Sequence, residues 1–135
     1  MTIYLVACVA KKAAYAMPAR EIYQSEWFQR ARAFVESTGA EWRILSAAHG
    51  LLHPGTVILP YDSTLTSMGI DKRREWAANV RRRITNELPA GGRCVVLAGQ
   101  RYREFLIDFL RSRYDVEVPM QGMGIGHQLQ FLGAK

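Results

Sequence analysis

Between residues 46 and 62, the chain carries a histidine and a carboxylate in polar segments that follow apolar runs. His49 precedes a glycine, and its imidazole could serve as an acid, a base or a donor to a base edge. Asp62 follows an aromatic residue, and a carboxylate stabilises the positive sugar that forms when a glycosidic bond breaks. Asp62 and His49 are therefore candidate catalytic residues. The alternatives are a packed structural histidine and a turn or capping aspartate.

Four further residues are candidates for contact with a nucleobase. Tyr61 offers a ring on which an unstacked base could lie. Gln100 carries an amide, while a cysteine and a serine stand near the ends of apolar runs. The alternatives are a buried reduced thiol at residue 8 and an ordinary strand-to-helix turn at residues 99–102. The candidate base-binding residues are Cys8, Ser46, Tyr61 and Gln100.

Arginine dominates the charge of the chain. Fourteen arginines and four lysines give a net charge of +6, with clusters at residues 72–74 and 81–83. The arginine fork fits phosphate, and positive potential steers anionic partners, so double-stranded DNA with a flipped base is the leading expected partner. A solvated basic face is the alternative. The candidate phosphate-binding residues are Lys11, Lys12, Arg74, Arg81, Arg82 and Arg101.

Composition limits the class of protein. A chain of 135 residues, 49% hydrophobic and 22% charged, is typical of one globular domain, which we place at residues 1–135. No apolar run approaches the roughly 20 residues of a membrane helix, and no basic leader precedes the first run, so we expect a cytoplasmic protein. Three scattered histidines match no metal site, and the glycines at 122–126 lack the dinucleotide context, so no metal or cofactor is expected.

The apolar pattern predicts alternating strands and helices. We expect strands at residues 2–8, 42–47, 93–98 and near 116–118. We expect helices at 21–38, at 71–88 with Asp71 as a cap, after residue 102, and at 127–132, with a long functional connection over 48–70. This order predicts a three-layer α/β sandwich with a mostly parallel sheet of about four strands.

Such a sheet gathers its polar loops at one edge. Ligands of parallel α/β sheets bind outside the carboxyl ends of the strands, and the unusual polar segments of this chain all follow strands. We therefore expect one shared cavity, lined by Lys11, Ser46, His49, Asp62 and Gln100.

Three motifs resemble known proteins. The segments Cys8-Val-Ala-Lys11-Lys12, Leu45-Ser46-Ala-Ala-His49-Gly50-Leu51-Leu52-His-Pro54 and Pro60-Tyr61-Asp62 resemble a small bacterial and phage domain family. The same motifs are similar to parts of the YaaA peroxide-stress proteins and of the uracil-DNA-glycosylase-like domains of tRNA-guanine transglycosylase-type enzymes. The resemblance implies a glycosylase-like fold that handles nucleobases, with some relatives acting on modified phage DNA. The water-activating loop of true uracil-DNA glycosylases is absent.

We therefore expect a DNA glycosylase that hydrolyses the N-glycosidic bond of a flipped, modified base, in defence against phage. A non-catalytic DNA-binding stress-response protein is one alternative. An enzyme acting on free nucleotides is the other, and it would need the pocket without the arginine face.

Overall fold

A five-stranded, mostly parallel sheet forms the centre of the protein. The computed structural model describes residues 1–8 and 12–133. The strand order is β4-β3-β1-β6-β7, and only β4 runs antiparallel to its neighbour. The strands are β1 (Thr2–Ala7), β3 (Glu41–Ser46), β4 (Gly50–Leu52), β6 (Arg93–Leu97) and β7 (Asp115–Glu117).

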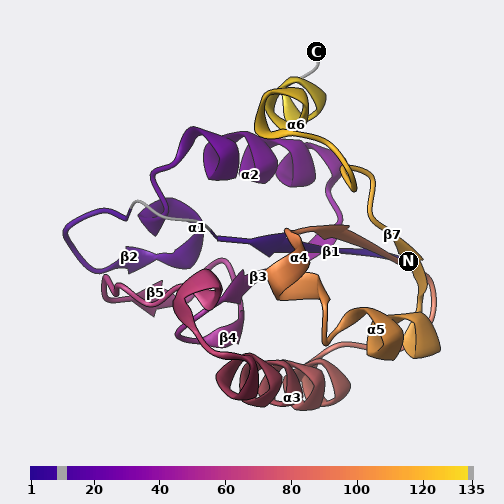
Figure 1. Ribbon diagram of the computed structural model, residues 1–135. Helices are drawn as coiled ribbons and strands as arrows, with labels where there is room; N and C mark the ends of the chain where they lie inside the picture. Colours follow the sequence, from indigo (N-terminus) through magenta and orange to yellow (C-terminus); the bar gives the residue numbers. More distant parts are fainter. Residues whose placement is uncertain (9–11, 134–135) are drawn as a thin grey trace.

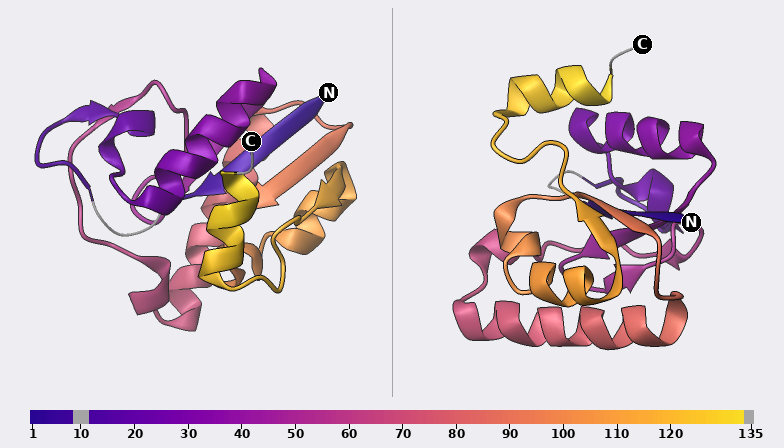
Figure 2. Two further views of the ribbon diagram at one scale, coloured as in Figure 1. Left: turned by 90° about the horizontal axis from the view of Figure 1, so that it is seen from above. Right: turned by 90° about the vertical axis from the view of Figure 1, so that its right-hand side faces the viewer.

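Helices cover both faces of this sheet, as Figures 1 and 2 show. On one face lie α2 (Glu26–Thr38) and α6 (Ile125–Leu132), and on the other lie α3 (Ile70–Glu87), α4 (Gln100–Arg103) and α5 (Ile107–Arg113). A small unit beside the sheet contains β2 (Met17–Pro18), α1 (Ala19–Ile22), β5 (Val57–Ile58) and the 3-10 helix η1 (Leu65–Ser67).

Alternation along β1 divides the core into two layers. Ile3 and Leu5 pack with the α3 side, whereas Tyr4 and Val6 pack with the α2 side. All four side chains are buried, as expected for a central parallel strand that is covered on both faces. The predicted α/β architecture with a mostly parallel sheet is confirmed.

The four predicted strands are present, and β4 is an additional strand. It was not predicted because it is three residues long and follows a turn at Gly50, whose φ of +68° places it in the left-handed region. Because β4 pairs with β3, the sheet has one more strand on the β3 side than we expected.

The predicted helix boundaries need three corrections. The helix expected over 21–38 is interrupted, because Ser25 accepts a hydrogen bond from the backbone of Phe28 at 3.2 Å and starts a new helix there. Asp71 does not cap α3, since Gly69 occupies the N-cap and Asp71 lies in the first turn. The helix expected after residue 102 is two short helices, α4 and α5.

Within the described residues, no helix combines the length and the apolar character that are needed to cross a membrane.

Candidate functional site

The hydroxyl of Tyr61 lies at the centre of a polar cluster at the carboxyl edge of the sheet. Ser46 Oγ and the hydroxyl of Tyr23 each lie 2.7 Å from it, and Cys8 Sγ lies 3.4 Å away. Ser46 ends β3 and Cys8 directly follows β1, and these two strands pair in parallel with Ala7 beside Leu45. The loop that carries Tyr61 is thus fastened to the ends of two adjacent central strands.

A cation and an imidazole flank the ring of Tyr61. The ammonium of Lys12 lies 4.3 Å from the ring centroid, and the His49 ring stands perpendicular to it at a centroid distance of 5.3 Å. The backbone N–H of His49 donates to Ser46 Oγ at 3.1 Å, which fixes the turn that carries the imidazole. His49 and Asp62 are both exposed. An imidazole and a cation therefore flank one hydrogen-bonded ring, and the exposed Asp62 is the next residue along the chain.

Both tyrosines of the cluster remain protonated at ordinary pH. Burial raises the pKa of the Tyr61 hydroxyl well above its usual value, and the neighbouring Cys8 adds to the shift. Burial and Cys8 raise the pKa of Tyr23 in the same direction. Neutral hydroxyls can donate and accept in the same network, so the cluster is suited to holding its neighbours in place.

These shifts predict that the protein loses stability in alkali. Below about pH 10 the tyrosines are protonated in both states, but above it only the unfolded chain loses their protons. The free energy of unfolding should then fall by up to ~1.4 kcal/mol per pH unit for each tyrosine. Urea unfolding between pH 8 and 11 measures this slope. Tyr61→Phe should flatten it, while Tyr15→Phe, at a site 76% exposed, should not; equal slopes in both variants would contradict the assignment.

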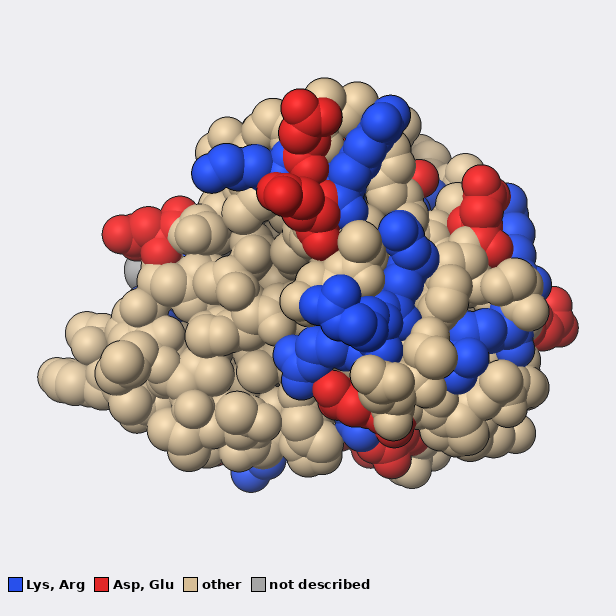
Figure 3. Space-filling model, turned by 90° about the horizontal axis from the view of Figure 1, so that it is seen from below, with Lys and Arg blue, Asp and Glu red and all other residues tan. Residues whose placement is uncertain are grey.

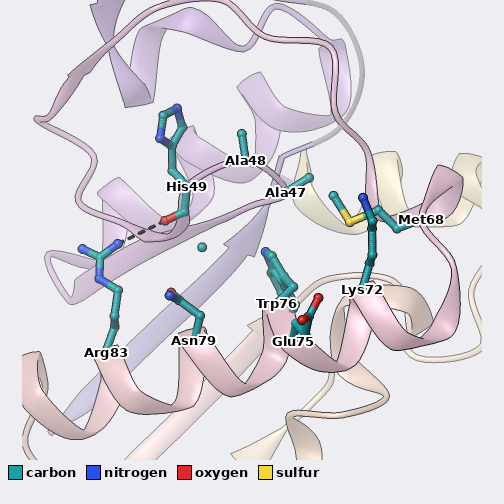
Figure 4. A pocket seen from close by; sticks show the side chains of 10 residues that line it. Ala47, Ala48, His49, Met68, Lys72, Glu75, Trp76, Asn79 and Arg83 are labelled. Atoms are coloured by element: carbon teal, nitrogen blue, oxygen red, sulfur yellow. Dashed lines mark hydrogen bonds between the residues drawn. The ribbon is translucent and has the colours of Figure 1, made fainter.

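A hollow of about 600 Å³ opens between the turn at residues 47–50 and helix α3 (Figure 4). Lys72, Asn79 and Arg83 extend from α3 toward the turn, whereas the imidazole of His49 points away from α3. Arg83 Nη1 donates to the carbonyl of His49 at 3.0 Å. The remaining polar lining includes Glu75, so the hollow contains cations, an amide and a carboxylate. It borders the Tyr61 cluster across the turn.

A second hollow, of about 350 Å³, lies between η1 and α4. Gln100 and Arg101 line it together with Thr66 and Tyr102. The hydroxyl of Tyr102 donates to the carbonyl of Cys8 at 3.0 Å, which connects this hollow to the end of β1. Gln100 therefore occupies a different hollow from the one beside His49.

The prediction that five residues share the lining of one cavity is therefore wrong for those of them that the structure describes. Ser46 is fully buried and lines neither hollow, Asp62 lines neither hollow, and Lys11 lies outside the described residues. The structure does bring five of the candidate residues together around one ring, namely Cys8, Lys12, Ser46, His49 and Tyr61.

The arginines of α3 divide between internal and external contacts. Arg81 donates to the carbonyl of Phe105 at 2.8 Å, and Arg74 lies 5.2 Å from the ring of Phe105. Arg73 is almost buried and pairs with Glu104 at 2.9 Å. Figure 3 shows basic side chains gathered on the face that α3 covers, with acidic ones among them. The face is less uniformly positive than the sequence clusters predicted.

The carboxylate of Glu104 pairs with two arginines, Arg73 of α3 and Arg101 of α4. Burial opposes its ionisation, but hydrogen bonds and charge from Arg73 and Arg101 outweigh that effect and lower its pKa. Arg101 lies 3.3 Å from Glu104 and is still 53% exposed. Arg101 can therefore contact a ligand, whereas Arg73 serves the fold.

Sequence reasoning did not identify Tyr23 and Trp76 as parts of the site. Tyr23 lay within the helix predicted at 21–38, and Trp76 lay within the helix predicted at 71–88. Trp76 Nε1 donates to the carbonyl of Ser46 at 2.8 Å, and its ring meets that of Tyr102 at a centroid distance of 5.7 Å. The spacing of Lys72, Glu75, Asn79 and Arg83, three or four residues apart, was the signal that could have indicated one lined face of α3.

A family model matches residues 3–134 of the chain, which is nearly its whole length. The protein belongs to the family of unknown function DUF6884. The comparison with curated proteins finds no match, and the comparison with solved structures finds none either. What the DUF6884 chain does must therefore be argued from its own residues.

Proposed function

We propose that the protein is a DNA glycosylase, which hydrolyses the N-glycosidic bond of a flipped and modified nucleobase. The observation that carries the proposal is the Tyr61 cluster, in which an imidazole and a cation flank a ring at the carboxyl edge of a parallel sheet, with Asp62 next along the chain. This edge is where such sheets bind ligands. The proposal includes a uracil-DNA-glycosylase-like fold and a cytoplasmic role in defence against phage.

The hydrogen bonds of the cluster support this chemistry because they hold the site rigid before a substrate arrives. Tyr61 is joined to two strand ends through Ser46 and Cys8, so the following residue, Asp62, has a fixed backbone position. A fixed carboxylate stabilises positive charge on the sugar more strongly in the transition state than in the ground state. Asp62 is the proposed stabiliser.

His49 is the proposed proton carrier. Its backbone is anchored to Ser46 on one side and to Arg83 on the other, while its exposed imidazole lies against Tyr61. An imidazole in this position could activate water or protonate the departing base. Lys12, close to the same ring, would attract a phosphate of the flipped nucleotide.

The arginines of helix α3 favour a polymeric substrate over a free nucleotide. Arg74, Arg81 and Arg82 lie along it, and the first two retain donors beyond their contacts with Phe105. Phosphate contacts supply most of the affinity for DNA, and extrusion of a base is needed before its glycosidic bond can be reached.

The proposal is tested by a search for released bases. The unmutated protein is incubated with ordinary DNA and with phage DNA that carries modified bases, and the free bases are measured by mass spectrometry. We expect one modified base to be released, with an abasic site left in the strand. DNA binding without release of any base would favour the non-catalytic binding protein. Release from mononucleotides alone would favour an enzyme of free nucleotides.

The basic residues of α3 make a separate prediction about salt. Changing Arg74, Arg81 and Arg82 together to alanine should weaken DNA binding and reduce the slope of log K against log salt by about one unit for each phosphate that is no longer bound. Fluorescence anisotropy between 50 and 300 mM salt, about the range over which such contacts weaken measurably, gives the slope. Arg32→Ala, on α2 at the opposite face of the sheet, is the control. Unchanged affinity and slope in the triple variant would make this face a solubility feature.

A further inference from the structure

The two hollows at the carboxyl edge share a wall. Trp76 lines the larger hollow and Tyr102 lines the smaller one, and their rings meet at 5.7 Å with an interplanar angle of 85°. Each ring is also tied to a central strand, since Trp76 donates to the carbonyl of Ser46 and Tyr102 to that of Cys8. The hollows are thus neighbouring compartments of one rigid edge, on the two sides of a fixed aromatic pair.

The smaller hollow has the groups that recognise one further nucleotide. Gln100 is exposed, and its amide can both donate and accept, as contact with a base edge requires. Arg101 keeps about half of its side chain exposed beside its contact with Glu104, so it has donors available for a phosphate. Thr66 adds a hydroxyl from η1, and the Tyr102 ring adds apolar surface.

We propose that two consecutive, unpaired nucleotides of a DNA strand occupy these compartments. One unit lies in the larger hollow, across the 47–50 turn from the His49 imidazole and the target base, and the next unit lies in the smaller hollow against Gln100 and Arg101. This inference rests on the proposed function and extends it, because it adds a site for unpaired nucleotides beside the flipped base and gives the enzyme a preference for the bases next to its target. Hollows of about 300–1,000 Å³ are typical of small-ligand sites, so each compartment suits one unit.

Unpaired bases fit this arrangement better than paired ones. A base within a duplex shows only its edges in the grooves, whereas an unstacked base shows a ring face and its pairing edge. Two compartments separated by a rigid aromatic wall require each base to enter by itself. A duplex would therefore have to open by two units, and a single strand would not.

The test measures binding against strand length, with oligothymidylates of one, two and six units competing against a fluorescein-labelled thymidine hexanucleotide. The dinucleotide should bind about tenfold more tightly than the mononucleotide, because its second unit adds contacts with Gln100 and Arg101 that together contribute about 1.4 kcal/mol. Gln100→Ala should remove most of that gain. Gln121→Ala changes an exposed glutamine that lines neither hollow, and it should bind like the unmutated protein.

Equal affinity for one, two and six units would overturn the inference, as would the absence of binding to any of these oligonucleotides. A full length dependence that Gln100→Ala leaves intact would overturn the placement in the smaller hollow. Because binding is measured without catalysis, the two proposals can fail separately. Binding that depends on strand length, without base release, would contradict only the glycosylase proposal. Base release that does not depend on strand length would contradict only the proposal that two nucleotides occupy the two hollows.

Discussion

Replacing Asp62 by asparagine should abolish most base release while DNA binding survives. The substitution keeps the shape of the side chain and removes the negative charge that, in the proposed mechanism, stabilises the developing positive sugar. Groups that take part in acid–base or electrostatic catalysis at such a site contribute about 10²–10⁴-fold, so a loss of at least about 100-fold is expected. The measurement is single-turnover formation of abasic sites, run beside a binding titration.

The control for Asp62→Asn is Asp115→Asn. Asp115 is also an exposed carboxylate, but it begins β7 at the amino edge of the sheet, away from the Tyr61 cluster. Its loss should leave the rate unchanged. Full activity in Asp62→Asn would contradict the role given to Asp62 and would direct attention to Glu75, which lines the larger hollow.

Replacing Trp76 by alanine should produce the largest loss of stability at the site. The side chain is 8% exposed, packs within the core on the α3 side and forms the wall between the two hollows. Truncation of a buried tryptophan costs about 3–5 kcal/mol, because apolar burial is removed and a cavity remains. Urea unfolding monitored by circular dichroism measures the change.

A milder variant separates packing from hydrogen bonding. Trp76→Phe keeps most of the ring but leaves the carbonyl of Ser46 without its donor, which should cost about 1–3 kcal/mol. Because Ser46 also supports Tyr61 and His49, this variant should lower base release as well as stability. Trp27→Phe is the matched control, since Trp27 is 9% exposed and donates to Gln128 on the opposite face. Equal losses of activity in both variants would mean that the effect is one of stability alone.

Strands β1 and β6 could be predicted from the sequence because they are short and mostly apolar on both faces. Residues 3–7 and 94–97 are continuous apolar runs, and such runs between polar segments are typical of buried parallel strands. β4 could not be predicted in the same way. Its three residues carry no period, and it exists because Gly50 turns the chain back onto β3.

The site could be predicted in part for a topological reason. Cys8 follows β1 and Ser46 ends the adjacent parallel strand β3, so the order of the elements brings them together. The role of Tyr61 depends instead on the path of the long loop, which no local pattern determines. Its hydroxyl binds the serine, the cysteine and Tyr23, and this makes it a positioning residue in addition to an aromatic surface.

The arginines of α3 differ in ways that no local pattern indicates. The clusters at 72–74 and 81–83 look equivalent along the chain, but helical geometry directs neighbouring residues to different sides of α3. Arg73 therefore pairs with Glu104, Arg81 reaches Phe105, and Arg83 reaches the carbonyl of His49. The number of charges predicts the electrostatic field around a protein. The partner of each guanidinium can be known only from the fold.

The most decisive test of the proposed glycosylase site is a crystal structure of Asp62→Asn bound to a short DNA strand that contains the modified base released in the screen. We predict that this base lies beside His49 and Tyr61, with its sugar facing residue 62 and a phosphate near Lys12. A strand bound only along α3, with the Tyr61 cluster unchanged and no base at the carboxyl edge of the sheet, would contradict the proposed site.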